Sequence, residues 1–196
     1  MNLFTTNKNV YIYLFDGFSD WEIAFLTPEL KKNDAINLLL VSDDGQPIIS
    51  AGGLKITPDI PLGSIDINTL DMLVLPGGLY WEKDNPSELI HNLLDTIYYK
   101  KSNIAAICAA TTYLGQKGYL NNIKHTSVDL GYLKYVAPEY TGEKYYQNKP
   151  VVSHDNIITA NGTAPIEFTQ SILTQLEFNT EYIDKWYQLF KFGIWI

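Results

Sequence analysis

The sequence predicts an α/β fold in which a mostly parallel sheet lies between two layers of helices. Short apolar runs of strand length alternate along the chain with amphipathic stretches of helical length. The runs are apolar throughout, which is typical of strands that are buried on both faces of a sheet. The chain has 196 residues, enough for one domain with a sizeable core, and shows no linker, repeat or low-complexity segment. We therefore expect residues 1–196 to form a single three-layer sandwich.

The first half of the chain contains three predicted strands and two predicted helices. The strands are 10–15, 36–41 and 72–75, and the helices are 20–32 and 88–100. The spacing of apolar residues in the first helix predicts that it faces the core with Trp21, Ala24, Phe25 and Leu26. Between the second and third strands, glycines and prolines punctuate residues 46–60, which we expect to form a small hairpin or a strand excursion.

The second half continues the alternation of strands and helices. A strand at 104–107 leads into a helix at 109–116, and later strands are expected at 145–146, 151–152 and 157–160, with a turn at 154–156. Pro165 is suited to the first turn of a helix over 165–176. A last helix, from about residue 180 to 190, carries an aromatic stripe that we expect to pack on the core or on another subunit.

The composition excludes several classes of function. The net charge of −8 argues against nucleic acid or an anionic membrane as a partner. A single cysteine permits no intramolecular disulfide and no multi-cysteine metal site, as is typical of a reducing compartment. The N-terminus lacks the pattern of a signal peptide, and no apolar run approaches the roughly 20 residues needed to span a bilayer. We therefore expect a soluble cytoplasmic protein.

The only cysteine, Cys108, stands where the strand at 104–107 meets the following helix. Unpaired N–H groups and the dipole at a helix N-terminus favour a thiolate, the form needed for nucleophilic or redox chemistry. The flanking alanines allow a sharp turn and leave the sulfur accessible. The alternative is that Cys108 is a small buried hydrophobic residue without chemistry.

Two other strand ends carry residues suited to the same site, because the carboxyl ends of parallel strands meet at one edge of a sheet. Glu22 follows the first strand and could share a proton with Cys108, although a first-turn glutamate can also simply complement the helix dipole. Gly77 and Gly78 follow the third strand, where their N–H groups, with that of Ala109, would form an oxyanion hole unless they form only a tight turn.

The remaining candidates have plainer explanations. Asp16 and Asp20 are suited to a turn and to a helix N-cap. Tyr80 and Trp81 either wall a pocket over Cys108 or pack elsewhere. A cysteine hydrolase usually needs an imidazole, but His91, His125 and His154 all lie in contexts typical of packing or surface histidines. The pocket that we expect around Cys108 includes Asp16, Gly77, Tyr80, Trp81, Thr111 and His125.

Four motifs in this order resemble the ThiJ/PfpI superfamily, from about residue 10 to residue 176. They are Asp16 to Glu22, Leu73 to Gly78, Ala105 to Thr111 and Ile157 to Phe168. The resemblance implies a flavodoxin-like sandwich related to class I glutamine amidotransferases. It also implies that Cys108 is a nucleophile-elbow cysteine, that Glu22 is its carboxylic acid partner, and that Gly78 and Ala109 supply the oxyanion N–H groups.

The superfamily includes enzymes of glyoxalase or deglycase type, among them the parkinsonism-associated member, as well as peptidases, isonitrile hydratases, chaperone-like proteins and oxidative-stress sensors. Where its peptidase-like members have a histidine, this chain has Val128, which cannot carry a proton. We therefore expect glyoxalase- or deglycase-type chemistry on small carbonyls. The alternatives are a cysteine-oxidation sensor or stress protein without turnover, a ligand-binding or regulatory module, and, least favoured, an intracellular peptidase or amidase.

The sequence also predicts what the protein binds. The expected partner is a small-molecule substrate, with neither nucleic acid nor membrane involved, and the resemblance implies a homodimer. No cofactor and no metal is expected, because the chain lacks a complete phosphate-binding glycine loop and clustered metal ligands.

Overall fold

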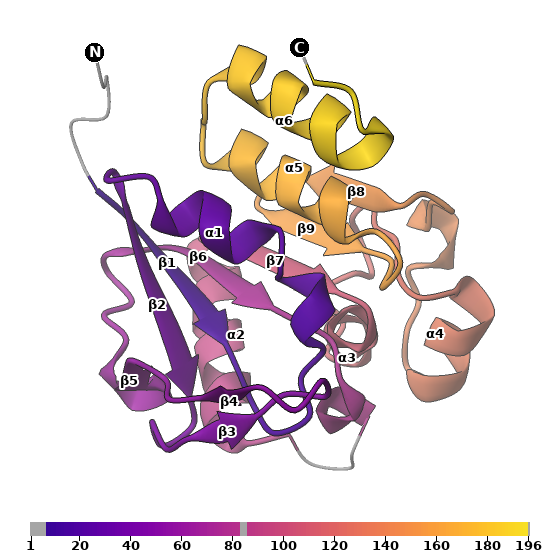
Figure 1. Ribbon diagram of the computed structural model, residues 1–196. Helices are drawn as coiled ribbons and strands as arrows, with labels where there is room; N and C mark the ends of the chain where they lie inside the picture. Colours follow the sequence, from indigo (N-terminus) through magenta and orange to yellow (C-terminus); the bar gives the residue numbers. More distant parts are fainter. Residues whose placement is uncertain (1–6, 83–85, 196) are drawn as a thin grey trace.

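A computed structural model describes residues 7–82 and 86–195 (Figure 1). Its main sheet has seven strands in the order β5-β2-β1-β6-β7-β9-β8, and all neighbours are parallel except β8 and β9. In chain order these strands are β1 (Lys8–Tyr13), β2 (Ile36–Ser42), β5 (Ile60–Pro61), β6 (Leu70–Leu75), β7 (Asn103–Ile107), β8 (Val151–His154) and β9 (Ile157–Ala160). The short strands β3 (Ile48–Ile49) and β4 (Lys55–Ile56) form the expected antiparallel hairpin within residues 46–60.

Helices cover both faces of this sheet, as the sequence predicts. On one face lie α1 (Leu26–Lys31), which packs on β2, and α5 (Pro165–Gln175), which packs on β9 (Figure 1). On the other face lie α2 (Glu88–Lys100) and α3 (Ala109–Gln116), which both pack on β7. The three-layer α/β sandwich is therefore confirmed.

The order of the strands creates one switch point, between β1 and β6. From β1 the chain crosses to β2 on one side, whereas from β6 it crosses to β7 on the other. Because such crossovers are right-handed, α1 and α2 fall on opposite faces, and a crevice forms outside the carboxyl ends of the strands at the switch point. The loops after β1, β6 and β7 therefore meet at this edge.

The predicted helix over 20–32 is wrong as a continuous element. The chain instead forms a 3-10 turn, η1 (Asp20–Glu22), and begins α1 only at residue 26. Since the interruption changes which face each residue occupies, Trp21 and Ala24 are exposed, whereas Leu26 is buried as expected. Asp20 is not an N-cap either, because its carboxylate accepts hydrogen bonds from the Ser50 hydroxyl and from the Gly52 N–H at 2.9 Å.

Two further differences lie between β7 and β9. Residues 145–146 do not form a strand, since the 3-10 helix η4 (Glu143–Tyr145) precedes a single bridge between Tyr146 and His125. The sequence pattern also gave no sign of α4 (Leu130–Val136), a helix of two turns with one fully buried side chain, Leu133. So short a helix has too few apolar positions to show a period, and its contact with α3 is what stabilises it.

The last helix, α6 (Thr180–Phe192), packs on α5 rather than on the sheet. Ile183 and Trp186 from its aromatic stripe are buried, whereas Phe190 and Phe192 remain exposed. Two more 3-10 helices, η2 (Leu62–Ser64) and η3 (Leu79–Glu82), complete the described elements. Within residues 7–82 and 86–195, no helix has the length and apolar character required to cross a membrane.

A buried hydroxyl joins β1 to the loops beside the switch point. Tyr13 is fully buried, and its hydroxyl lies 2.8 Å from the Asp43 carboxylate and 2.9 Å from the Tyr80 hydroxyl. Ser87, the N-cap of α2, donates to the same carboxylate. We expect Tyr13→Phe to lower the free energy of unfolding by about 1–2 kcal/mol, because the half-buried Asp43 carboxylate and Tyr80 hydroxyl then lose a partner. Urea unfolding checks this, with Tyr99→Phe on the surface of α2 as a control that should leave stability unchanged.

Candidate active site

Glu22, Gly77 and Cys108 come together at the switch point, where β1, β6 and β7 end side by side. A Cβ atom on Gly77 would lie 2.6 Å from the Cys108 Cβ and 2.8 Å from Glu22 Oε2. Both distances are shorter than any tolerable contact, so only glycine fits between the acid and the cysteine. This close approach brings together three residues that are far apart in the sequence.

Cys108 occupies the sharp turn between β7 and α3. Its backbone angles, φ 59° and ψ −132°, lie in a region that non-glycine residues rarely adopt. The turn is held because the Cys108 N–H donates to Ala160 in β9, while the Cys108 carbonyl accepts from both the N–H and the hydroxyl of Thr111. The backbone constraint thus fixes where the sulfur lies at the edge of the sheet.

The Glu22 side chain is completely buried and turned toward the cysteine. Its Oε2 accepts a hydrogen bond of 2.5 Å from the Gly77 N–H. Its Oε1 has no hydrogen-bond partner among the described residues, although the Cys108 thiol and the Ser19 hydroxyl lie near enough to lower the pKa of the carboxyl. Burial raises the pKa of Glu22 to about 7, although the Gly77 N–H opposes the shift. Glu22 is therefore not the exposed first-turn glutamate of the simpler explanation.

The thiol does not have the low pKa that its place at a helix N-terminus suggests. The Ala109 N–H lowers the pKa of Cys108, but burial and then the neighbouring Glu22 carboxylate outweigh it and raise that pKa to about 12. Glu22 and Cys108 titrate as a pair. Below about pH 7 the pair holds two protons, and above that pH it holds one proton, which is lost only at a much higher pH. A thiolate near neutral pH therefore requires that Glu22 hold the shared proton.

The turn after β6 is braced by aromatic side chains. Gly78 has φ +147°, and a Cβ there would lie 2.7 Å from the Phe15 ring. Tyr80 stacks on Phe15, with ring centroids 4.5 Å apart. Trp81 is fully buried, and its indole N–H donates to the Pro76 carbonyl at 2.7 Å. Tyr80 and Trp81 thus support the glycine turn, and among the described residues the Gly78 N–H has no acceptor.

Gly162 belongs to the site, although the sequence analysis did not single it out. A Cβ on Gly162 would lie 2.8 Å from the Cys108 sulfur. Its neighbour Asn161 donates from the side chain to the Val128 carbonyl at 2.7 Å, which ties this loop to the start of α4. One feature of the sequence could have identified Gly162: it follows soon after the predicted strand at 157–160, at the same edge of the sheet as Cys108.

The other expected pocket residues have structural contacts instead. Asp16 is exposed and accepts from the Ile49 N–H at 2.8 Å. The Thr111 hydroxyl also lies 2.6 Å from the Ser127 hydroxyl. His125 is fully buried, with its ring nitrogens 2.7 Å from the Ile123 carbonyl and 2.6 Å from the Tyr140 hydroxyl, and burial lowers its pKa. An imidazole held on both sides in this way is not free to act on Cys108.

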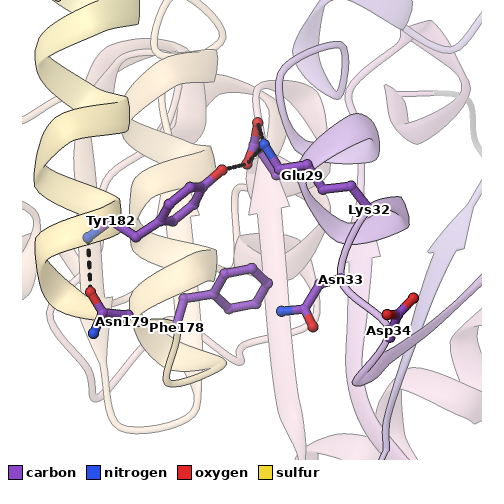
Figure 2. A pocket seen from close by; sticks show the side chains of 7 residues that line it. All are labelled: Glu29, Lys32, Asn33, Asp34, Phe178, Asn179 and Tyr182. Atoms are coloured by element: carbon purple, nitrogen blue, oxygen red, sulfur yellow. Dashed lines mark hydrogen bonds and ion pairs between the residues drawn. The ribbon is translucent and has the colours of Figure 1, made fainter. Parts of the chain in front are cut away.

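A hollow of about 370 Å³ lies elsewhere, between α1 and the start of α6 (Figure 2). Two of its charged groups are paired with each other, because Lys32 lies 2.7 Å from the Glu29 carboxylate, which also accepts from the Tyr182 hydroxyl. The hollow contains none of Cys108, Glu22 and Gly77. In the part of the chain that the structure describes, no group of three or more His, Cys, Asp or Glu side chains could hold a metal ion.

With this geometry in place, comparison with known proteins assigns the family. The sequence model of the DJ-1/PfpI family matches residues 8–175. The chain belongs to the DJ-1/PfpI family. A thiJ/pfpI family protein from Bacillus anthracis is 36% identical and has a similar structure, with a TM-score of 0.88 over 96% of this chain and 92% of that one. The resemblance seen in the sequence motifs is therefore confirmed.

Family relatives have been given different functions. The protein YoaZ of Bacillus subtilis, named an uncharacterized protease, is 40% identical over 94% of this chain and 91% of its own length. The protein DJR-1.2 of Caenorhabditis elegans, named a glutathione-independent glyoxalase, is 29% identical over 79% of this chain and 81% of its own length. Family membership thus supports both a protease-like and a glyoxalase-like hypothesis, and the residues of the site have to decide between them.

The raised pKa of Glu22 should make stability depend on pH. Below about pH 4.5 the carboxyl is protonated in both states, but as the pH rises to 7 the unfolded chain ionises first, so stability is lost. Glu22→Gln keeps an acceptor for Gly77 and removes this loss. We expect the variant to gain about 2 kcal/mol relative to the native protein between pH 5.5 and pH 8, measured by urea unfolding. Glu139→Gln, an exposed change of the same charge, should show no such gain; equal pH profiles for all three proteins would contradict the buried acid.

Access to the sulfur should depend on the missing side chain at position 162. We expect Gly162→Ala to slow alkylation of Cys108 by iodoacetamide about tenfold or more, because the added methyl group would occupy the space beside the sulfur. The matched control is Gly63→Ala, where an added Cβ meets no atom within 4 Å. Near-ultraviolet circular dichroism establishes that both variants are folded, and equal rates in the two would show that Gly162 does not border the sulfur.

Proposed function

We propose that this protein is a cofactor-independent enzyme that converts small 2-oxoaldehydes to 2-hydroxy acids through a covalent bond to Cys108. The observation that carries the proposal is the buried Glu22 carboxyl beside the thiol, because its pKa of about 7 suits a group that must both accept and donate protons at neutral pH. The glyoxalase name of the Caenorhabditis elegans relative supports the same chemistry.

In the first step, Cys108 transfers its proton to Glu22 and its sulfur attacks the aldehyde carbon. A carbon–sulfur bond forms while the carbonyl π electrons move to oxygen. In this mechanism the Ala109 N–H, which lowers the pKa of the thiol, and the Gly78 N–H, which has no acceptor among the described residues, would stabilise the resulting alkoxide. Glu22 then returns its proton to this oxygen, which gives a neutral hemithioacetal and leaves a carboxylate.

In the second step, the Glu22 carboxylate removes the proton from the former aldehyde carbon, the electron pair moves to the former ketone oxygen, and Glu22 gives the proton to that oxygen, so that an enediol forms. A proton added to the adjacent carbon, with loss of the hydroxyl proton, gives a thioester of the 2-hydroxy acid. Water then adds to the thioester and the carbon–sulfur bond breaks, which releases the acid and restores the thiol. The aldehyde carbon is oxidised and the ketone carbon is reduced, so no external oxidant or cofactor is needed.

A peptidase reaction fits these residues less well, although two Bacillus subtilis relatives are named uncharacterized proteases. A cysteine peptidase protonates its leaving amine with an imidazole. Val128 stands at the position that the superfamily pattern gives to histidine, and both ring nitrogens of His125 are already engaged. Among the described residues around Cys108, Glu22 is the acid that can move a proton.

The second candidate is a sensor in which Cys108 is oxidised without turnover. It is favoured by Glu22 Oε1, which has no hydrogen-bond partner among the described residues and, when protonated, could donate to a sulfinate oxygen on Cys108. Mass spectrometry after dilute peroxide distinguishes the two functions. A sensor gains two oxygens at Cys108 and does not consume methylglyoxal, whereas the proposed enzyme consumes it at catalytic rates.

Conversion of the substrate should require both Cys108 and Glu22. We expect formation of lactate from methylglyoxal, without added glutathione or metal, to fall at least a hundredfold in Cys108→Ser and in Glu22→Gln. Glu22→Asp keeps the acid but shortens its reach, so it should retain more activity than Glu22→Gln. The measurement is enzymatic quantification of lactate, with Glu139→Gln as the charge-matched control. Full activity in Glu22→Gln would overturn the proposed mechanism.

A further inference from the structure

The loop between β9 and α5 covers one side of the cysteine and its acid. A Cβ on Gly162, within this loop, would lie 2.8 Å from the Cys108 sulfur and 3.5 Å from Glu22 Oε1. The glycine backbone therefore borders both the sulfur and the acid oxygen that has no hydrogen-bond partner among the described residues. Any molecule that bonds to the sulfur has to fit beside this backbone, so the position of the loop sets how much room remains.

Four hydrogen bonds of the Asn161 side chain hold the loop in place. Its amide nitrogen donates to the Val128 carbonyl at 2.7 Å and to the Ser127 carbonyl at 3.3 Å. Its amide oxygen accepts from the Thr163 N–H at 3.0 Å and from the Thr163 hydroxyl at 2.9 Å. The amide thus uses both of its N–H donors and both lone pairs of its oxygen. These bonds fix the residues on either side of Gly162.

The segment to which Asn161 bonds is itself tied to the cysteine. The Ser127 hydroxyl lies 2.6 Å from the Thr111 hydroxyl, which donates to the Cys108 carbonyl at 2.6 Å. Ser127 and Thr111 are both fully buried. A closed path therefore runs from the cysteine through Thr111, Ser127 and Asn161 to the glycine beside the sulfur. This path fixes how closely Gly162 approaches the sulfur.

The same loop is not packed on all sides. Asn161 and Thr163 also line a hollow of about 310 Å³, which includes neither Cys108 nor Glu22, and Thr163 is exposed. The loop therefore has space into which it can move. Its position against the sulfur depends on the hydrogen bonds of Asn161, because surrounding side chains do not enclose it.

We propose that Asn161 is a positioning residue which, through Gly162, restricts Cys108 to small carbonyl compounds. As a statement about substrates, this rests on the proposed function. With the loop held in place, the room beside the sulfur suits methylglyoxal better than phenylglyoxal, which carries a ring next to its carbonyl groups. Without the amide the loop moves away from the sulfur, and the preference for the smaller molecule weakens.

The test compares two neutral alkylating agents that differ in size. Iodoacetamide and its N-phenyl derivative both bond to the Cys108 sulfur and release iodide, so the fraction of thiolate cancels from the ratio of their rate constants. Dividing this ratio by the ratio for free N-acetylcysteine removes the intrinsic difference between the reagents. We expect the corrected ratio to favour iodoacetamide about tenfold in the native protein, and to lose most of this preference in Asn161→Ala.

Further variants identify the contacts that matter. Asn161→Asp keeps the size of the side chain and its acceptor for Thr163 but cannot donate to the two carbonyls, so the ratio should fall as in Asn161→Ala. Thr163→Ala, an exposed change that removes one of the four bonds, should lower the ratio by less. The matched control is Asn156→Ala, which removes a hydrogen bond of 2.7 Å to the Ser102 carbonyl at the opposite end of β9 and should leave the ratio unchanged.

A loss of stability alone does not count as support, because Asn156→Ala also loses a hydrogen bond. An unchanged ratio in Asn161→Ala overturns the proposal, and so does an equal fall in Asn156→Ala. A native protein that does not favour iodoacetamide, or a cysteine that neither reagent modifies, overturns it as well. Near-ultraviolet circular dichroism establishes which variants are folded. If neither Asn161 variant folds, Thr163→Ala decides, and an unchanged ratio there overturns the proposal.

The alkylation ratio does not require turnover, so it separates this proposal from the proposed function. A fall of the ratio in Asn161→Ala, in a protein that does not convert methylglyoxal, supports the role of Asn161 and overturns only the glyoxalase reaction. Where turnover is present, Asn161→Ala should also lower kcat/KM for methylglyoxal relative to phenylglyoxal about tenfold. Turnover in which Asn161→Ala leaves this preference unchanged overturns the role of Asn161 alone.

Discussion

The buried Glu22 carboxyl, in contact with both the Gly77 N–H and the Cys108 thiol, is the interaction on which the architecture of the site depends. A carboxyl without exposure to water is costly unless it is protonated or well bonded. Here one oxygen accepts from the Gly77 N–H, whereas the other has no hydrogen-bond partner among the described residues, so the cost is only partly offset and the remainder appears as a raised pKa. The same burial that destabilises the ionised acid makes it able to exchange a proton with its neighbour near neutral pH.

This interaction explains several local features that would otherwise look unrelated. The chain interrupts its first helix so that Glu22 can turn inward, which leaves Trp21 on the surface. Position 77 has to be glycine because the acid and the cysteine approach it from two sides, and Cys108 adopts a rarely populated backbone conformation to present its sulfur. All of these irregular features involve Glu22 itself or a residue beside its carboxyl group. They are unfavourable on their own, and the packing of the regular sheet around them offsets their free-energy cost.

The sequence predicted the parts of the structure that depend on the spacing of apolar and polar residues along the chain. The apolar strands, the long helix α2 and the meeting of three strand ends follow from periodicity and from the geometry of parallel sheets. The sequence could not predict features that depend on packing. It placed Trp21 and Ala24 in the core because it assumed an unbroken helix, and it overlooked α4 because seven residues show no clear period. It also missed Gly162, which approaches the cysteine only in the folded chain.

The expected low pKa of Cys108 is the most informative of these errors. The Ala109 N–H at the helix N-terminus does lower the pKa of the thiol, but burial and the neighbouring Glu22 carboxylate outweigh this one backbone donor. The chemistry therefore cannot rest on a permanently ionised cysteine. In the proposed mechanism a proton moves from the sulfur to Glu22 when a substrate arrives, and N–H groups favour negative charge on the substrate oxygen over negative charge on the acid. A site of this kind has a thiol that stays largely protonated at rest, which suits an enzyme better than a sensor, because oxidants react with the thiolate.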